Sequence, residues 1–575
     1  MKLILLFLFL FDSLLSSAQA NRNDIVIDEI MADPTPQARV VNGLPEVEFI
    51  ELKNISQKII NLNGWKVSDA TATATISVNF MLQPDSFVVI ASVNAASLLA
   101  PFGRSLGVSN FLSLNNDGEL IYLTSKEGKI IHAVEFNSSW YQNAVKSNGG
   151  WTLEMIDTKN TCGGATNWTA SQHPLGGTPG KKNSTDAINQ DKIPPALLRS
   201  YATDSSSITL VFDESLDSLS SAVASDYFIS DDIGVAVSAT TPGPLFNKVF
   251  LKLDHPLKKN IVYSITAKKL SDCAGNEIGM ADNTKVGLAS AIDNLDIVIN
   301  EMLFNPKAVG TDYIEIYNRS KKIADLNDIY LANRTSSGSA GSLKQLSISP
   351  RLFFPGEYLV ITENARIVKQ QYFTRAPDAF LELNSLPSYP NDLGIVLLLS
   401  GTGKLIDEVS YTEKWHFKLI INYEGVALER IDYNKPSQDV GNWHSAAASN
   451  GYGTPGYQNS QFMSELMGDA TIAITPAIFS PDNDGLNDFA TIAYSFPEPG
   501  YVCNICFYDI NGRAVKYLTR NTICGLTGYY RWDGLGEKNN KLPIGIYVMI
   551  TEVFNLKGKT KKFKNGIVLA RRFNY

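Results

Sequence analysis

The chain carries one sequence module twice, and this duplication constrains its fold more than any other feature. The segment DIVIDEI at 24–30 returns as DIVINEM at 296–302, and LEMID at 153–157 returns as LERID at 428–432. Two copies of about 160 residues, with about a hundred residues between them, are typical of tandem domains rather than of a short-period solenoid. Such a duplication more often multiplies a surface or extends a reach than it multiplies an active site.

The first twenty residues are expected to be a secretory signal peptide. Lys2 supplies a positive start, 3–15 is an apolar run, and Ala18-Gln19-Ala20 is a small-x-small cleavage site. No later stretch approaches the ~20 apolar residues of a membrane helix. We therefore expect a secreted or outer-surface protein without a transmembrane segment.

The composition limits the classes of protein that need to be considered. At 575 residues the chain is too long for a single core, and about four domains are expected. The net charge is −8, and no basic face precedes the C-terminus, so a nucleic-acid partner is not expected.

The pattern of apolar residues predicts an all-β protein. Runs such as SFVVIA (86–91) and EYLVIT (357–362) are short, branched or aromatic, and bounded by turn residues. The best helical candidates are single turns near Ala95–Leu99 and Ala365–Gln371. Short strands at this spacing indicate tandem Ig-like β-sandwiches.

Several ordered elements agree in both copies: an acid on the opening strand, a Glu-x-x-Asn strand, a proline, an Asn-Trp pair and a closing Thr-Pro-Gly. They are Glu29, Glu51, Asn54, Pro84, Asn167-Trp168 and 178–180 in the first copy, and Glu301, Glu315, Asn318, Pro355, Asn442-Trp443 and 454–456 in the second. In this the repeated module resembles the lamin-tail domain, an Ig-like sandwich also found in secreted bacterial proteins. The first copy has the preferred Gly64-Trp65 at a turn, whereas the second departs with Asp328-Ile329. We expect Trp168 and Trp443 to occupy equivalent core positions.

The other two regions carry weaker resemblances. Between the copies, SITLVFDESLD (207–217) and DCAGNEI (272–278) occur in an order similar to bacterial Ig-like modules of surface-layer type. After the second copy, FSPDNDGLND (479–488) and FYDINGRAV (507–515) resemble the type IX sorting domains, and hook-cap-like Ig modules, of exported surface proteins. Asn511-Gly512 within the latter predicts a hairpin with a type I′ turn.

These observations give a domain map. The map assigns 1–20 to the signal peptide, 21–183 and 294–460 to the two lamin-tail-like domains, 193–290 to the bacterial Ig-like domain, and 471–575 to a C-terminal Ig-like sorting or attachment domain. Polar linkers are expected near 181–192, 288–295 and 458–470.

The matched acids are the first candidates for chemistry. Glu29 and Glu51, like Glu301 and Glu315, lie on early strands and could form carboxylate pairs. The favoured interpretation is structural: buried acids accept hydrogen bonds from loop amides. No histidine recurs beside them, because His132 aligns with Asp407 of the other copy. We therefore predict no catalytic residues.

Two loops could be taken for metal sites. Asp482, Asp484 and Asp488 surround Gly485 at a spacing that hard cations use, so they are the candidate metal ligands and calcium the candidate ion. The alternative is an Asx-rich turn. For Asp272 in D-x-x-G-N, the turn is the favoured interpretation.

Five cysteines do not make a disulfide scaffold in a chain of this length. Cys162 and Cys273 are isolated in sequence, whereas Cys503, Cys506 and Cys524 cluster. A bridge from Cys503 or Cys506 to Cys524 is favoured over buried free thiols, and the odd total leaves at least one cysteine unpaired within the chain.

The predicted function is a non-catalytic, secreted or cell-surface binding, adhesion or scaffold protein built from duplicated sandwiches. Its partners would be an extracellular polymer or surface protein, and the export machinery through the C-terminal domain. The alternative is a secreted hydrolase or nuclease-associated protein acting on an extracellular polymer, which would need an acid pair or a histidine-metal cluster.

Overall fold

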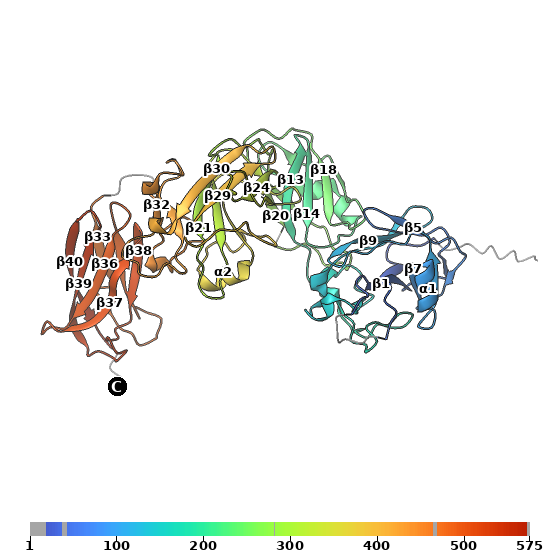
Figure 1. The fold of residues 1–575 in the computed structure, drawn as a ribbon, viewed down its shortest axis with the longest axis horizontal. Coiled ribbons are helices and arrows are strands. Elements are labelled where there is room, and N and C mark those ends of the chain that lie inside the picture. Colours follow the sequence, from blue (N-terminus) through green and yellow to red (C-terminus); the bar gives the residue numbers. More distant parts are fainter. Residues whose placement is uncertain (1–18, 37–42, 281, 464–467, 572–575) are drawn as a thin grey trace, which may run out of the picture. The chain divides into compact units, whose positions relative to one another are not determined.

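The computed structural model describes residues 19–36, 43–280, 282–463 and 468–571, and regular structure in them is almost entirely β (Figure 1). The all-β prediction is confirmed. The expected signal peptide, apart from residues 19 and 20, lies outside the described residues. Within them, no helix is long and apolar enough to cross a membrane.

The described residues contain two α-helices, and both occur where the sequence suggested helical turns. They are α1 (Val93–Leu99) and α2 (Ala365–Gln371). Each starts at a polar cap: Ser92 Oγ accepts the N–H of Ala95, and Asn364 Oδ1 accepts the N–H of Ile367.

The first copy encloses one apolar core between a six-stranded sheet, order β12-β11-β1-β2-β7-β8, and a four-stranded sheet, order β10-β9-β4-β5, with β3 and β6 paired separately. Its strands are β1 (Ile25–Met31), β2 (Phe49–Asn54), β3 (Ile60–Asn61), β4 (Lys66–Ser68), β5 (Thr73–Thr75), β6 (Met81–Leu82), β7 (Phe87–Ser92), β8 (Ser105–Val108), β9 (Gly118–Thr124), β10 (Ile130–Asn137), β11 (Leu153–Met155) and β12 (Trp168–Ala170).

The second copy repeats this topology strand for strand, with sheets β32-β31-β21-β22-β27-β28 and β30-β29-β24-β25 and the pair β23-β26. Its strands are β21 (Ile297–Leu303), β22 (Tyr313–Asn318), β23 (Ala324–Asp325), β24 (Ile329–Ala332), β25 (Lys344–Gln345), β26 (Leu352–Phe353), β27 (Tyr358–Thr362), β28 (Phe380–Glu382), β29 (Leu393–Ser400), β30 (Leu405–Thr412), β31 (Leu428–Arg430) and β32 (Trp443–Ser445). Even the bulge between Ile27 and Glu29 recurs, between Ile299 and Glu301.

The predicted equivalence of Trp168 and Trp443 is confirmed, since both indoles are only 3 % exposed in the cores of their copies. Another tryptophan side chain lies beside each of these two indoles. The ring centroids of Trp140 and Trp168 are 6.4 Å apart, and those of Trp415 and Trp443 are 6.2 Å apart.

The residues between the copies form a smaller pair of sheets, which we call the spacer module, in the orders β13-β14-β18-β17 and β16-β15-β19-β20. Its strands are β13 (Leu197–Asp204), β14 (Ser207–Phe212), β15 (Tyr227–Ile229), β16 (Gly234–Val235), β17 (Ser238–Thr240), β18 (Lys248–Lys252), β19 (Tyr263–Ala267) and β20 (Asn283–Val286).

The C-terminal module, drawn in orange to red in Figure 1, has two sheets. Their strand orders are β33-β35-β38 and β34-β40-β39-β36-β37. Its strands are β33 (Thr471–Thr475), β34 (Ile478–Phe479), β35 (Ala490–Ser495), β36 (Val502–Tyr508), β37 (Ala514–Ile523), β38 (Thr527–Trp532), β39 (Gly545–Phe554) and β40 (Thr560–Leu569).

The hairpin between β36 and β37 forms as predicted, but its turn is not type I′. A type I′ turn needs positive φ at both central residues. Here Gly512 has φ 76°, whereas Asn511 is not among the residues with positive φ. The backbone pairs Asp509 with Arg513, and Gly512 N–H donates to the Asp509 carbonyl, which closes a three-residue loop ending in a left-handed glycine.

The chain forms two compact units. One comprises Met1–Lys258 and Tyr263–Val286, and the other Lys259–Val262 and Gly287–Tyr575. The first copy and the spacer module thus belong mainly to one unit, and the second copy and the C-terminal module to the other.

The segments expected to be free linkers are partly bonded to the copies they follow. After the first copy, Asn183 donates to the carbonyls of Asp28 and Met155, and Asn189 N–H donates to Asp157. The domain boundaries drawn from the sequence remain a prediction, but residues 183–189 are tied to the first copy.

Candidate functional site

Three glutamates of each copy lie side by side in the six-stranded sheet, and we call them the glutamate trio. The trio consists of Glu29, Glu51 and Glu154 in the first copy, and of Glu301, Glu315 and Glu429 in the second. All six side chains are fully buried. The predicted approach of the paired acids is therefore confirmed. The third member was missed, although LEMID and LERID repeat it in the sequence.

In the first copy the trio holds the closing Thr-Pro-Gly segment. The Thr178 N–H donates to Glu29 (2.7 Å) and the Thr178 hydroxyl to Glu154 (3.0 Å). The Gly180 N–H donates to Glu51. These contacts close the chain of the first copy over its own sheet.

The second copy repeats these contacts in full. The Thr454 N–H donates to Glu301 (2.9 Å), and its Oγ1 lies 2.8 Å from Glu429. The Gly456 N–H donates to Glu315 (2.6 Å). Because the same bonds recur in a copy of divergent sequence, they belong to the architecture of the module.

Burial alters the protonation of these groups. Desolvation, and secondly a neighbouring glutamate, raises the pKa of Glu29 and of Glu301 to about 8. The same causes raise the pKa of Glu51 and of Glu315 well above the usual range of a carboxyl. A general acid or base must reach the proton it transfers. These groups face the closing segment instead, and this supports the structural interpretation.

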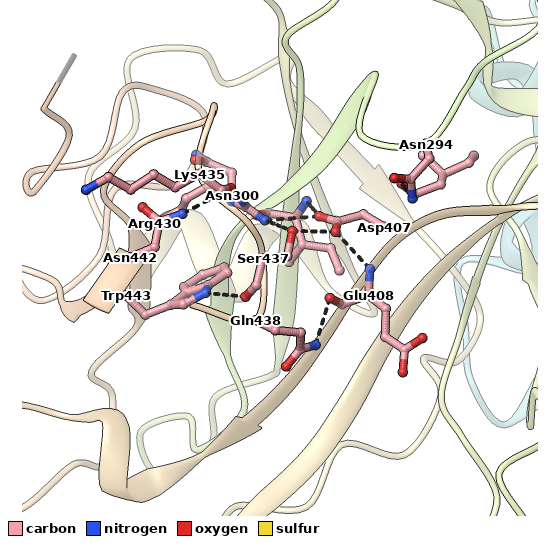
Figure 2. A network of polar contacts seen from close by, with 12 residues as sticks. Asn294, Asn300, Asp407, Glu408, Arg430, Lys435, Ser437, Gln438, Asn442 and Trp443 are labelled. Carbon is pink, nitrogen blue, oxygen red and sulfur yellow. Dashed lines mark hydrogen bonds and ion pairs between the residues drawn. The ribbon is translucent and has the colours of Figure 1, made fainter. Parts of the chain in front are cut away.

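Figure 2 shows a buried polar network around Asp407 in the second copy. Its carboxylate accepts the N–H groups of Ile299 (2.8 Å) and Glu408 (2.8 Å). It also accepts the Ser437 hydroxyl (2.5 Å) and the Arg430 guanidinium (3.1 Å). Each oxygen of Asp407 thus accepts two bonds, and the pKa of the carboxyl is raised by its burial and lowered by Arg430 and these bonds, with burial the larger effect.

The first copy has different residues in the same places. The aligned sequences put His132 opposite Asp407, Met155 opposite Arg430 and Cys162 opposite Ser437. His132 Nδ1 accepts the Ile27 N–H (3.1 Å), as Asp407 accepts that of Ile299. The predicted equivalence of His132 and Asp407 is thus confirmed.

The cysteines pair differently from the favoured expectation. Cys162 of the first copy forms a disulfide with Cys273 of the spacer module. Cys503, Cys506 and Cys524 are free and buried, so the favoured bridge to Cys524 is wrong and the alternative of buried thiols holds. A bridge across 111 residues leaves no local signal in a sequence.

The turn interpretation of D-x-x-G-N is confirmed. Asp272 Oδ1 accepts the N–H groups of Ala274 (2.8 Å), Gly275 (2.6 Å) and Asn276 (2.9 Å). Its carboxylate also lies within 4.8 Å of those of Asp191 and Glu214, a cluster that the sequence did not suggest.

The candidate calcium loop brings its three carboxylates together. Oxygens of Asp482, Asp484 and Asp488 lie within 4.8 Å of one another. Asp488 also accepts the N–H groups of Asn483 (2.7 Å) and Gly485 (3.0 Å). Both the metal site and the Asx-rich turn are compatible with this geometry, and calcium stays a prediction.

Comparison with a family model supports the resemblance of the repeated module. Residues 18–138 and 290–413 match the model of the Lamin Tail Domain family, in agreement with the resemblance of the two copies. No curated protein matches the chain.

Several solved structures are distantly similar to the chain. The N-terminal part of the bacterial S-layer protein SbsC shares 12 % identity at a TM-score of 0.16, covering 38 % of this chain and 44 % of that one. Dimeric latent PorU from Porphyromonas gingivalis shares 12 % identity at a TM-score of 0.15, and the match covers 71 % of this chain and 35 % of that one. A tetra-tandem repeat in the extending region of a large adhesion protein shares 9 % identity at a TM-score of 0.13, and the match covers 95 % of this chain and 98 % of that one. The chain spans about half the length of the S-layer structures, and similarity at these scores carries no argument about function.

Proposed function

We propose that this protein is a non-catalytic scaffold or adhesion protein that works outside the cytoplasm. The observation that carries the proposal is the disulfide between Cys162 and Cys273, which joins the first copy to the spacer module. Disulfides persist in oxidising compartments and are rare in the cytosol. A covalent bond between two modules favours a role in which they are held as one body.

The alternative, a secreted hydrolase, has less support. The acids that it would need are the two glutamate trios, which are fully buried and bonded to the closing segments. The partner of the protein in the scaffold role would be an extracellular polymer or another surface protein.

Mass spectrometry of alkylated cysteines tests the extracellular proposal. Protein from the culture medium or the cell surface should carry label on Cys503, Cys506 and Cys524 only after denaturation, because these thiols are buried. Cys162 and Cys273 should stay unlabelled until a reductant is added. Labelling of both in denatured, unreduced protein would overturn the proposal.

We also propose that residues 471–575 direct export and attachment through the export machinery. The module has a core of its own, in which Phe507 stacks on Trp532 with ring centroids 3.8 Å apart. It also packs on the second copy, where Phe417 clusters with Val502 and Ile523.

Deletion of residues 471–575 should leave the protein in the periplasm. The deletion also exposes Phe417, so Phe417→Ser in the full chain is the control, because it disturbs the same contact but keeps the tail. The sorting role is supported if the Phe417→Ser protein reaches the cell surface and the protein without residues 471–575 does not. A deletion that still reaches the surface excludes it.

A further inference from the structure

A cavity of about 340 Å³ lies within the first compact unit, between the first copy and the spacer module. Six of the residues that line it carry the argument: His132, Trp140, Trp168, Asp191, Glu214 and Phe246. This volume falls in the range of small-molecule sites, which combine apolar walls with a few polar groups.

His132 lines the cavity, and its ring carries a nitrogen without a hydrogen-bond partner among the described residues. Burial lowers the pKa of His132 to about 4, so the imidazole is neutral at pH 7. Because Nδ1 accepts the Ile27 N–H, the ring proton must be on Nε2. This atom is buried and has no hydrogen-bond partner among the described residues, and the Thr161 carbonyl near the ring only partly offsets the effect of burial on the His132 pKa. An oxygen of a ligand in the cavity would satisfy it.

The second copy shows why this donor is unused. There the equivalent Asp407 receives the Arg430 guanidinium and the Ser437 hydroxyl (Figure 2). In the first copy Met155 stands in place of the arginine, and Cys162 is engaged in its disulfide. The polar groups that close the network in one copy are therefore lacking in the other, where a cavity lies beside the histidine.

Two carboxyl groups also line the cavity. Asp191 of the segment after the first copy and Glu214 of the spacer module lie with carboxylate oxygens within 4.8 Å of each other. The nearby cation, Arg22, is already engaged: it donates to Leu216 and Ser215 and stacks 4.0 Å above the Phe246 ring. Burial, and secondly Asp191, raises the pKa of Glu214 to about 8, so this carboxyl is largely protonated at pH 7. Arg22 keeps its positive charge, but Glu135, Asp191 and Asp213 also line the cavity, so the net charge of the lining is negative and disfavours an anionic ligand.

Aromatic rings complete the set. Trp140 is half-buried beside the buried Trp168, and both side chains line the cavity. One N–H donor, two carboxyl acceptors and an indole match a molecule with many hydroxyl groups and an apolar C–H face. We propose that this cavity binds a non-acidic sugar residue, neutral or amino, of an extracellular glycan. The proposal goes beyond the scaffold role and does not depend on it.

A glycan array and calorimetry with the full mature chain test the proposal. The probes are neutral, amino and acidic oligosaccharides, with cellohexaose, a chitosan hexamer and hexagalacturonate as the soluble representatives. Trp140→Leu should weaken binding by ~10-fold, the loss expected for one aromatic contact. Trp415→Leu, at the equivalent position of the second copy, is the matched control and should leave the affinity within about twofold.

A second variant keeps the test decisive if the tryptophan change disturbs folding. His132→Asp combined with Met155→Arg rebuilds the Asp407–Arg430 pair in the first copy, using residues that this fold already accommodates in the second. It should abolish binding and preserve the β-sheet circular dichroism spectrum. Three results would overturn the proposal: no non-acidic glycan binds more tightly to the native chain than to this double variant, the acidic probe binds best, or the two tryptophan variants lose affinity equally.

Discussion

The hydrogen bonds of the buried glutamate trio in the second copy require a protonated glutamate. In the second copy Thr454 Oγ1 has one hydrogen, yet it lies 2.8 Å from Glu429 and 3.0 Å from Glu301. The contacts are all satisfied if Thr454 donates to Glu429 and a protonated Glu301 donates to Thr454. Tyr313 then donates to the remaining oxygen of Glu301 (2.7 Å). The raised pKa of Glu301 agrees with this arrangement.

The pH dependence of stability follows from that proton. The folded protein holds it up to about pH 8, whereas a glutamate in the unfolded chain has its ordinary pKa of 4.5. The contribution of this proton to the free energy of unfolding is therefore complete below pH 4.5 and is lost as the pH rises through 8. Glu301→Gln keeps both the acceptor and the donor, so it should reduce the loss of unfolding free energy between about pH 6 and pH 9 in urea titrations. Glu301→Ala should cost ~1–3 kcal/mol at about pH 6. Equal slopes for Gln and native protein would show that Glu301 is ionised.

The Asp407–Arg430 pair gives a second prediction for single residues. Arg430→Met leaves a buried carboxylate without its cation and should cost ~3–5 kcal/mol. Adding Asp407→His reproduces the residues of the first copy. The double variant should regain most of the lost free energy of unfolding, measured by urea denaturation. A double variant as unstable as the single one would mean that the two copies pack differently around this position.

Short elements were predicted well where the signal is local. Both helices, the paired tryptophans and the Asp272 turn follow from residues close together in sequence. The turn at Asn511-Gly512 was placed correctly but given the wrong type, because a glycine that needs positive φ fits both a two-residue and a three-residue loop.

The aspartate loop at 482–488 supports a prediction about one element. Three carboxylates within 4.8 Å repel one another, and a dication would relieve the repulsion. Calcium should therefore raise the melting temperature of the C-terminal module, because an ion that binds only the folded form stabilises it. Asp484→Ala should remove the response, measured by differential scanning calorimetry with and without chelator. Identical melting curves would leave the loop as an Asx-rich turn held by Asp488.

At the scale of the whole molecule, the sequence predicted modules but not their connections. The repeat predicts two similar sandwiches, because their strands follow one another in the same order and share several residues at matching positions. The Cys162–Cys273 bridge and the cavity beside His132 depend on residues from two modules, and periodicity carries no information about such pairs. The bonds of Asn183 and Asn189 were missed for a related reason, since a polar run predicts a linker whether or not its amides find partners.

Limited trypsin digestion tests the connection within the first unit. Lys192 and the following Ile193 are both exposed. In a short digestion of the native protein, trypsin should therefore cut after Lys192. The disulfide spans the cut, because Cys162 precedes it and Cys273 follows it. The two products should therefore migrate together on a non-reducing gel and separate when reductant is added. In a Cys162→Ser variant they should separate without reductant. Separation of the native products in the absence of reductant would mean that the two modules are not covalently joined, and the strongest support for an extracellular scaffold would be lost.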